Sequence, residues 1–129
     1  MKKYLLDSNA AIDYIGGKLP VKAVAWLDGI IEADVSVSVI NRIEILGFKP
    51  SDPSDFIPFD ELLKTVDIIG LHEEIILQAI EIRRGHKIKL PDAIVAATAL
   101  TLQLTVITRN IADFQKILDL EIVNPHDVI

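Results

Sequence analysis

Four short stretches of the chain place acidic or amide side chains beside apolar residues: "LLDSN", "NRIEIL", "LPDAIV" and "VITRNIAD". They contribute Asp7, Glu44, Asp92, Asn110 and Asp113. A carboxylate among apolar residues is costly to desolvate unless a positive group or a hydrogen-bond donor meets it. Several such oxygens in one place are the ligands that Mg²⁺ or Mn²⁺ prefers, and an ion held by them activates water against a phosphodiester bond.

Each of these polar residues also has a simpler structural explanation. Taken alone, Asp7 is better explained as the cap of the short helix that follows it. Asp92 lies in the first turn of a helix, where the helix dipole stabilises acids. Glu44, at the boundary of an apolar helix stripe, stays undecided between a solvated face and a site. Near the C-terminus, Thr108 or Asn110 is explained as the N-cap of the last expected helix.

The hydrophobic periodicity predicts strands and helices that alternate along the chain. We expect short apolar strands at residues 3–6, 34–39, 66–71, 104–109 and 120–125, and helices at residues 9–15, 21–33, 39–48, 59–66, 72–87, 90–103 and 110–118. This alternation predicts an α/β fold, a three-layer α/β/α sandwich around a mainly parallel sheet. The length predicts a single domain over residues 1–129.

In parallel sheets, functional sites form at the carboxyl ends of the strands. Asp7 and Asn110 end two of the expected strands, and Asp92 begins the buried helix that leads into the second of them, so they can converge at one edge. Two carboxylates ~4 Å apart repel by about 4 kcal/mol at an effective dielectric constant of ~20. A bound proton or cation must therefore offset this repulsion. Without cysteine or a paired-histidine motif, the oxygen ligands favour Mg²⁺ or Mn²⁺ over zinc.

Composition limits the possible partners. The net charge of −6 means that the whole molecule does not attract phosphate backbones. Local positive charge for RNA could come from the run Arg83 to Lys89 and from Arg109, but charge compensation at a helix C-terminus and a solvated loop explain the run slightly better. A mean hydropathy of +0.39 predicts a large core and an apolar surface that a second subunit or a partner covers.

The apolar runs of the chain are shorter than a membrane span requires. None approaches the ~18 apolar residues of a spanning helix. Asp7 also interrupts the first apolar run where a secretory signal would need to continue. The expected location is therefore the cytoplasm, with no membrane contact.

The order of "LLDSNAAID", "INRIEIL", "LPDAIVAATAL" and "VITRNIADF" resembles the PIN-domain ribonucleases, most closely the VapC-type toxins of bacterial toxin–antitoxin pairs. The resemblance covers essentially the whole chain, and four motifs in series are specific although no single one is diagnostic. It implies a PIN-like fold and a Mg²⁺-dependent endoribonuclease with Asp7, Glu44 and Asp92 as its acidic triad. The family's fourth position, often Asp, is Asn110 here, which puts a second metal ion in doubt; Asp113 could supply a carboxylate indirectly.

The resemblance also implies supporting residues and partners. Ser8 and Thr108 would position the acids or their waters, Asn9 would lie at the rim, and Arg109 would support the site. The expected substrate is RNA. The expected assembly is a homodimer that forms a heterotetramer or larger complex with a small antitoxin, whose C-terminal segment lies in the active-site groove.

Three other functions compete with this interpretation. Asn110 keeps open a catalytically silent PIN-like binding module. A Mg²⁺-dependent phosphatase of haloacid-dehalogenase type needs a second aspartate two residues after Asp7, where the chain has Asn9. A phosphoacceptor receiver domain needs an aspartate at the end of a middle strand, but "DVSVSV" ends on Ser38 and Val39.

Overall fold

The computed structural model describes residues 2–128 as alternating strands and helices. The strands are β1 (Tyr4–Leu6), β2 (Val35–Ser38), β3 (Asp67–Ile69), β4 (Thr105–Ile107) and β5 (Ile122–Val123). The helices are α1 (Ser8–Ile15), α2 (Val21–Ala33), α3 (Val39–Gly47), α4 (Phe56–Thr65), α5 (Glu73–Gly85), α6 (Leu90–Leu102) and α7 (Ile111–Phe114), with 3₁₀ turns η1 (Pro53–Asp55) and η2 (Pro125–Asp127). Within residues 2–128, none of the helices has the length and apolar character needed to cross a membrane.

The five strands form one sheet in the order β3-β2-β1-β4-β5, and every neighbouring pair is parallel. The α/β fold with a parallel sheet is therefore confirmed. β1 lies at the centre, with Tyr4 beside both Val35 and Thr105. All strands point the same way, so the segments that follow β1, β2 and β4 leave the sheet at one edge.

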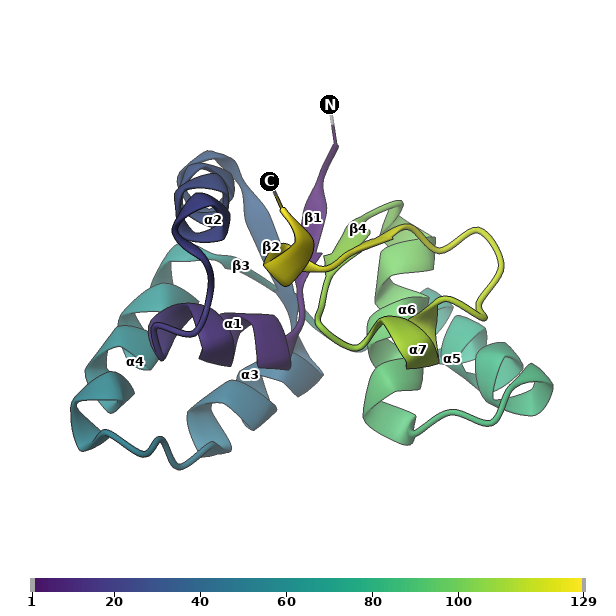
Figure 1. Ribbon diagram of the computed structural model, residues 1–129. Helices are drawn as coiled ribbons and strands as arrows, with labels where there is room; N and C mark the ends of the chain where they lie inside the picture. Colours follow the sequence, from purple (N-terminus) through teal and green to yellow (C-terminus); the bar gives the residue numbers. More distant parts are fainter. Residues whose placement is uncertain (1, 129) are drawn as a thin grey trace.

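Both faces of the sheet are covered by helices, as Figure 1 shows with α1 to α4 on one side and α5 to α7 on the other. The side chains of Leu5 and Leu6 point to opposite faces and belong to two separate hydrophobic clusters. Val106 and Ile107 on β4 divide in the same way. This double burial explains why the strands read as continuous apolar runs instead of alternating polar and apolar residues.

Helix α6 lies inside the protein, as its apolar sequence predicts. Every residue from 93 to 99 is buried, and four of these seven residues are alanines. Small side chains allow α6 to approach both α5 and the sheet closely. Its first turn, which carries Asp92, therefore begins beside the sheet edge.

Two helices differ from the sequence expectation by more than two residues at one end. The helix expected at 59–66 begins at Phe56, because η1 leads directly into it and Pro58 is tolerated in a first turn. The helix expected at 110–118 ends at Phe114, because Ile117 N bonds Phe114 O and tightens the chain into a turn. This turn places Ile117 in the core.

Candidate active site

Asp7 lies at the carboxyl end of β1 as the N-cap of α1. Its carboxylate is buried, with 4% exposure, and its Oδ1 accepts hydrogen bonds from Ser8 N and Asn41 Nδ2, both at 2.9 Å. Its Oδ2 accepts from Thr108 Oγ1 at 2.8 Å and from Asn9 Nδ2 at 3.2 Å. The capping role is thus confirmed, but it accounts for only the contact with Ser8 N. The other donors hold Asp7 at the edge of the sheet.

The electrostatic surroundings of Asp7 oppose its ionisation. Burial raises the pKa of the carboxyl group, and the negative charge of Glu44 raises it further. Hydrogen bonds from Thr108, Ser8 N and Asn41 lower the pKa because they stabilise the ionised form. Burial outweighs these donors, so the carboxylate favours an added positive charge.

Glu44 belongs to the same hydrogen-bond network, although it lies on the exposed side of α3. Its Oε1 accepts a hydrogen bond from Ser8 Oγ at 2.7 Å and a longer one from Asn41 Nδ2 at 3.4 Å. Asn41 Nδ2 also donates to Ser8 Oγ at 2.9 Å. Ser8 and Asn41 therefore connect Glu44 to Asp7, and the expected proximity of these two acids is observed.

Sequence reasoning missed Asn41 as a site residue. The Asn41 side chain is fully buried. Within residues 2–128, its Oδ1 is the only buried side-chain nitrogen or oxygen atom without a hydrogen-bond partner. A signal was present, because Asn41 precedes Glu44 by three residues and so shares its helix face. A buried amide on that face indicates a polar partner from another element.

Asp92 is half-buried in the first turn of α6 and lies within electrostatic reach of the other acids. Burial is the largest cause that raises its pKa to about 6, followed by the charges of Asp7, Asp113 and Glu44. The ammonium group of Lys89 acts in the opposite direction. The carboxylates from β1, α3, α6 and α7 thus share one local environment, as the position of their elements predicts.

The loop between β4 and α7 supplies the remaining polar groups. Thr108 is fully buried, and its Oγ1 accepts hydrogen bonds from Asn110 N at 3.0 Å and from Asn9 Nδ2 at 3.1 Å. Asn110 Nδ2 donates to Asp113 Oδ2 at 3.0 Å. Asn110 and Asp113 therefore form a pair one helical turn apart, with Asp113 nearer to solvent than Thr108.

Arg109 connects this loop to α1. Its backbone N donates to Asn9 Oδ1 at 2.8 Å, and its guanidinium contacts Asp13, a buried carboxylate on α1. His126 Nε2 lies 2.9 Å from Asp13 Oδ2. Sequence reasoning missed both Asp13 and His126. A signal for Asp13 was its position four residues after Asn9, which puts both side chains on one face of α1.

The donor chemistry fits a hard divalent cation, but the present arrangement is open. Oxygen atoms of carboxylates, amides and hydroxyls line the site, and these suit Mg²⁺ or Mn²⁺. Within residues 2–128, no three acidic or histidine side chains stand close enough to enclose an ion. Mg²⁺ commonly keeps several waters and uses only one or two protein carboxylates, so an open site of this kind is chemically suitable.

Solved structures share this architecture along nearly the whole chain. A toxin–antitoxin complex from Klebsiella pneumoniae is 28% identical, with 95% of this chain and 98% of that chain covered and a TM-score of 0.77. FitAcB from Neisseria gonorrhoeae is also 28% identical, with 95% and 97% covered and a TM-score of 0.74. DNA-bound VapBC from Salmonella typhimurium has a TM-score of 0.81 over 97% and 99% of the chains but only 19% identity, which supports the fold alone.

The sequence comparisons give the same result at the family level. No matching relative was found among curated proteins. The sequence profile of the PIN domain matches residues 4–118, which include every acid of the site. The resemblance to PIN-domain proteins is thereby confirmed, and a toxin–antitoxin complex is among the solved structures that this chain is similar to. The chain belongs to the PIN domain family.

Proposed function

We propose that the protein is a Mg²⁺-dependent endoribonuclease and the toxin of a VapBC-type toxin–antitoxin pair. One observation carries this proposal: Ser8 and Asn41 donate hydrogen bonds to both Asp7 and Glu44, and the charges of these two acids and of Asp113 act on the half-buried Asp92. Acids from separate elements have been brought together, and the ammonium group of Lys89 compensates only part of their charge. Membership of the PIN family supports a nuclease, and PIN nucleases usually use divalent metals.

In this proposal Asp7, Glu44 and Asp92 would hold the ion, directly or through its bound waters, and the ion is Mg²⁺ or, as a substitute, Mn²⁺. The ion supplies Lewis-acid chemistry, polarising the phosphodiester and lowering the pKa of the attacking water. Asn41 and Thr108 orient Asp7 from opposite sides, one on each carboxylate oxygen. Their contacts hold the carboxylate in place before substrate binds, so that little reorganisation is required.

Asn110 and Asp113 have supporting roles in the proposed reaction. Asn110 Nδ2 donates to Asp113 Oδ2, which keeps the Asp113 carboxylate oriented beside Asp92. We propose that Asp113, oriented in this pair, accepts a proton from the attacking water molecule. Ser8 Oγ bonds Glu44 and so limits the rotamers of this exposed side chain.

RNA is the proposed substrate, and a small antitoxin is the proposed partner. One structural neighbour is a toxin–antitoxin complex, which supports a protein partner for this chain. Exposed apolar residues on opposite sides of the molecule support a homodimer that binds the antitoxin as a heterotetramer or larger complex. These residues are Ile76, Leu77 and Ile80 on α5, and Ile43, Leu46, Phe56 and Ile57 on α3 and α4. We place this activity in the cytoplasm, where RNA and antitoxin are both available.

A catalytically silent binding module is the second candidate. The four donors to Asp7 already occupy the usual acceptor capacity of a carboxylate, so an ion must displace at least one of them. Asn9 Nδ2 makes the longest of the four bonds and is the donor expected to leave. PIN family membership favours either nuclease or silent module over the phosphatase and receiver alternatives.

The test is cleavage of a panel of structured RNAs, including tRNA, by purified protein without an antitoxin. Reactions contain Mg²⁺ or EDTA, and compare wild type with Asp7→Asn, Asp92→Asn and the exposed control Asp60→Asn on α4. Cleavage that needs Mg²⁺, is lost in the two site variants and is kept in Asp60→Asn supports the nuclease. Cleavage that survives Asp7→Asn would place the activity elsewhere, and Mg²⁺ binding without cleavage of any RNA would favour the silent module.

A further inference from the structure

A recess beside the acidic site is lined by lysines from two separate segments. Lys87 and Lys89 lie between α5 and α6, and Lys116 follows α7. With Ile88 and Asp113 they surround a volume of about 480 Å³. Lys116 Nζ donates to the backbone carbonyl of Lys87 at 2.6 Å, which ties the two segments together. We call Lys87, Lys89 and Lys116 the lysine recess.

The lysine recess is a local exception in an acidic protein. The whole chain has a net charge of −6, yet all three lysines are exposed side by side around one hollow. Among the described residues, the ion pairs within 4 Å involve Lys2, Arg109 and His126 and none of these lysines. Their charge is therefore available to an anion from solution.

The lysine recess opens next to the acids that the proposed reaction uses. Asp113 lines the recess and also bonds Asn110. Lys89 is close enough to Asp92 to oppose the effect of the neighbouring carboxylates on it. The lysine recess therefore adjoins the place where the proposed reaction would hold a phosphate.

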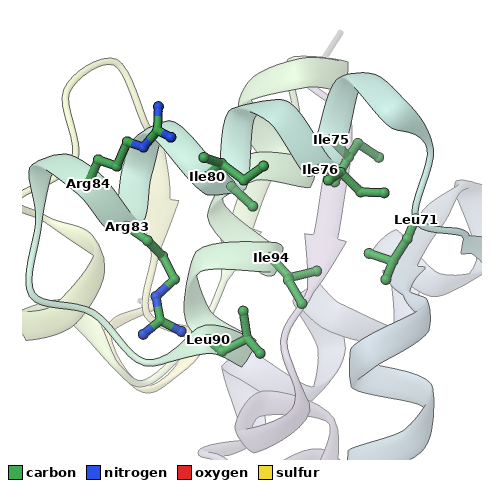
Figure 2. A pocket seen from close by; sticks show the side chains of 9 residues that line it. Leu71, Ile75, Ile76, Ile80, Arg83, Arg84, Leu90 and Ile94 are labelled. Atoms are coloured by element: carbon green, nitrogen blue, oxygen red, sulfur yellow. The ribbon is translucent and has the colours of Figure 1, made fainter.

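The other basic residues of the run 83–89 face a different surface. Figure 2 shows Arg83 and Arg84 at one end of an apolar groove of about 500 Å³, which Leu90 and Ile94 of α6 also line. α5 ends at Gly85, so the chain turns between the arginines and Lys87. The basic run is thus divided, and only its second half joins Lys116 beside the site.

We infer that Lys87, Lys89 and Lys116 form a phosphate-binding track that holds the RNA backbone on one side of the cleavage site. This inference rests on the proposed function. The contacts are ionic and independent of sequence, so each lysine contributes to affinity and to salt dependence more than to the bond-breaking step. A basic track also explains how an acidic protein retains a polyanionic substrate.

The test compares the Lys87→Ala, Lys89→Ala, Lys116→Ala triple variant with a control triple variant, Lys22→Ala, Lys49→Ala, Lys64→Ala. The control removes the same charge from exposed positions on α2, before η1 and on α4. Fluorescence anisotropy measures binding of a labelled single-stranded RNA in EDTA over a range of salt concentrations. We expect roughly tenfold weaker binding or more for the recess variant, and a log–log salt slope smaller by about 2, from ~0.7 per lost contact.

Cleavage in Mg²⁺ provides a second readout. At saturating Mg²⁺, the recess variant should raise KM by a similar factor and leave kcat within about twofold. No lysine touches the reacting atoms in this scheme, and the bound ion then replaces the effect of Lys89 on Asp92. Replacing all three lysines with arginine should restore binding. A single-stranded DNA of the same sequence should lose affinity in parallel, since its phosphates are the same; a loss confined to RNA would overturn the phosphate assignment.

The outcomes separate this inference from the proposed function. If RNA binding depends on the lysine recess but wild type cleaves no RNA, the phosphate-binding track would be supported and the proposed nuclease activity would be overturned. Equal losses in both triple variants would overturn the track, because net charge alone would explain them. Unchanged RNA binding together with lost binding of an acidic protein partner would also overturn it, and would assign the lysine recess to that partner.

Discussion

The guanidinium of Arg109 holds the buried carboxylate of Asp13, with Nη1 3.0 Å from Oδ1 and 2.8 Å from Oδ2. The Asp13 side chain is 4% exposed and that of Arg109 is 55% exposed. This pair joins α1 to the loop that carries Thr108 and Asn110. Its geometry is therefore linked to the position of Thr108 Oγ1 on Asp7.

Removing the guanidinium should destabilise the fold. Arg109→Ala leaves the buried Asp13 with His126 as its remaining side-chain partner, so we expect the free energy of unfolding to fall by about 1–2 kcal/mol. The loss is smaller than the ~3–5 kcal/mol typical of fully buried pairs, because the side chain of Arg109 is half-exposed. Urea unfolding measures it, with the exposed Arg42→Ala on α3 as control. Equal stability of the two variants would show that the pair contributes nothing.

The charge of Asp92 should cost stability at neutral pH. Its pKa is raised from 3.8 to about 6, so the folded state binds this proton more tightly than the unfolded state. The contribution of Asp92 to stability therefore decreases as the pH rises from about 4 to about 6, and stays unfavourable above that. We expect the free energy of unfolding of Asp92→Asn to exceed that of wild type by about 1 kcal/mol near pH 8, after allowance for solvent screening of a half-exposed group.

Unfolding in urea near pH 8 and near pH 4 measures this difference, which should vanish at the lower pH. The exposed Asp60→Asn on α4 is the matched control. Mg²⁺ should stabilise wild type more than Asp92→Asn, because a bound cation relieves the same repulsion. A stability gain that is as large near pH 4 as near pH 8 would contradict the electrostatic explanation.

Two buried threonines allow a matched test of the hydroxyl on Asp7. Thr108→Val keeps the shape of the side chain but removes the donor to Asp7 Oδ2, and we expect a loss of about 10–100-fold in activity or Mg²⁺ affinity. Thr98→Val, within α6, removes only a hydrogen bond to the carbonyl of Ile94. Steady-state cleavage and Mg²⁺ titration measure both variants. Similar losses for Thr98→Val and Thr108→Val would mean that packing alone is affected.

Asn41 provides a test of how strongly the site demands positive charge. Asn41→Asp adds a carboxylate beside Asp7 and Glu44, so we expect the free energy of unfolding in EDTA to fall by about 3 kcal/mol. Mg²⁺ or Mn²⁺ should recover part of this loss. Asn41→Ala removes the donors without adding charge, and its stability should respond less to the metal. If the metal restores the same amount of stability to Asn41→Asp and to Asn41→Ala, charge neutralisation at this position would be ruled out.

The order of elements and the place of two of the acids, Asp7 and Asp92, could be predicted from local sequence. Apolar runs that alternate with helical periodicity predict a parallel sheet, because strands buried on both faces must be apolar throughout. Asp7 directly follows such a run, and Asp92 begins an apolar helix, so both were expected at the sheet edge. The helix after Asn110 was predicted too long, since the turn after Phe114 depends on Ile117 entering the core.

The partners of the polar side chains were decided only by tertiary structure. Asn41 meets Asp7 across 34 residues, Arg109 meets Asp13 across 96, and His126 meets Asp13 across 113. Hydrophobic periodicity reports which face of an element is buried, not which polar group from a distant segment lies against that face. Local sequence therefore determined which elements form and which acids reach the sheet edge. Packing of the helices across the sheet determined which donors hold those acids, because a buried polar group must find its partner in three dimensions.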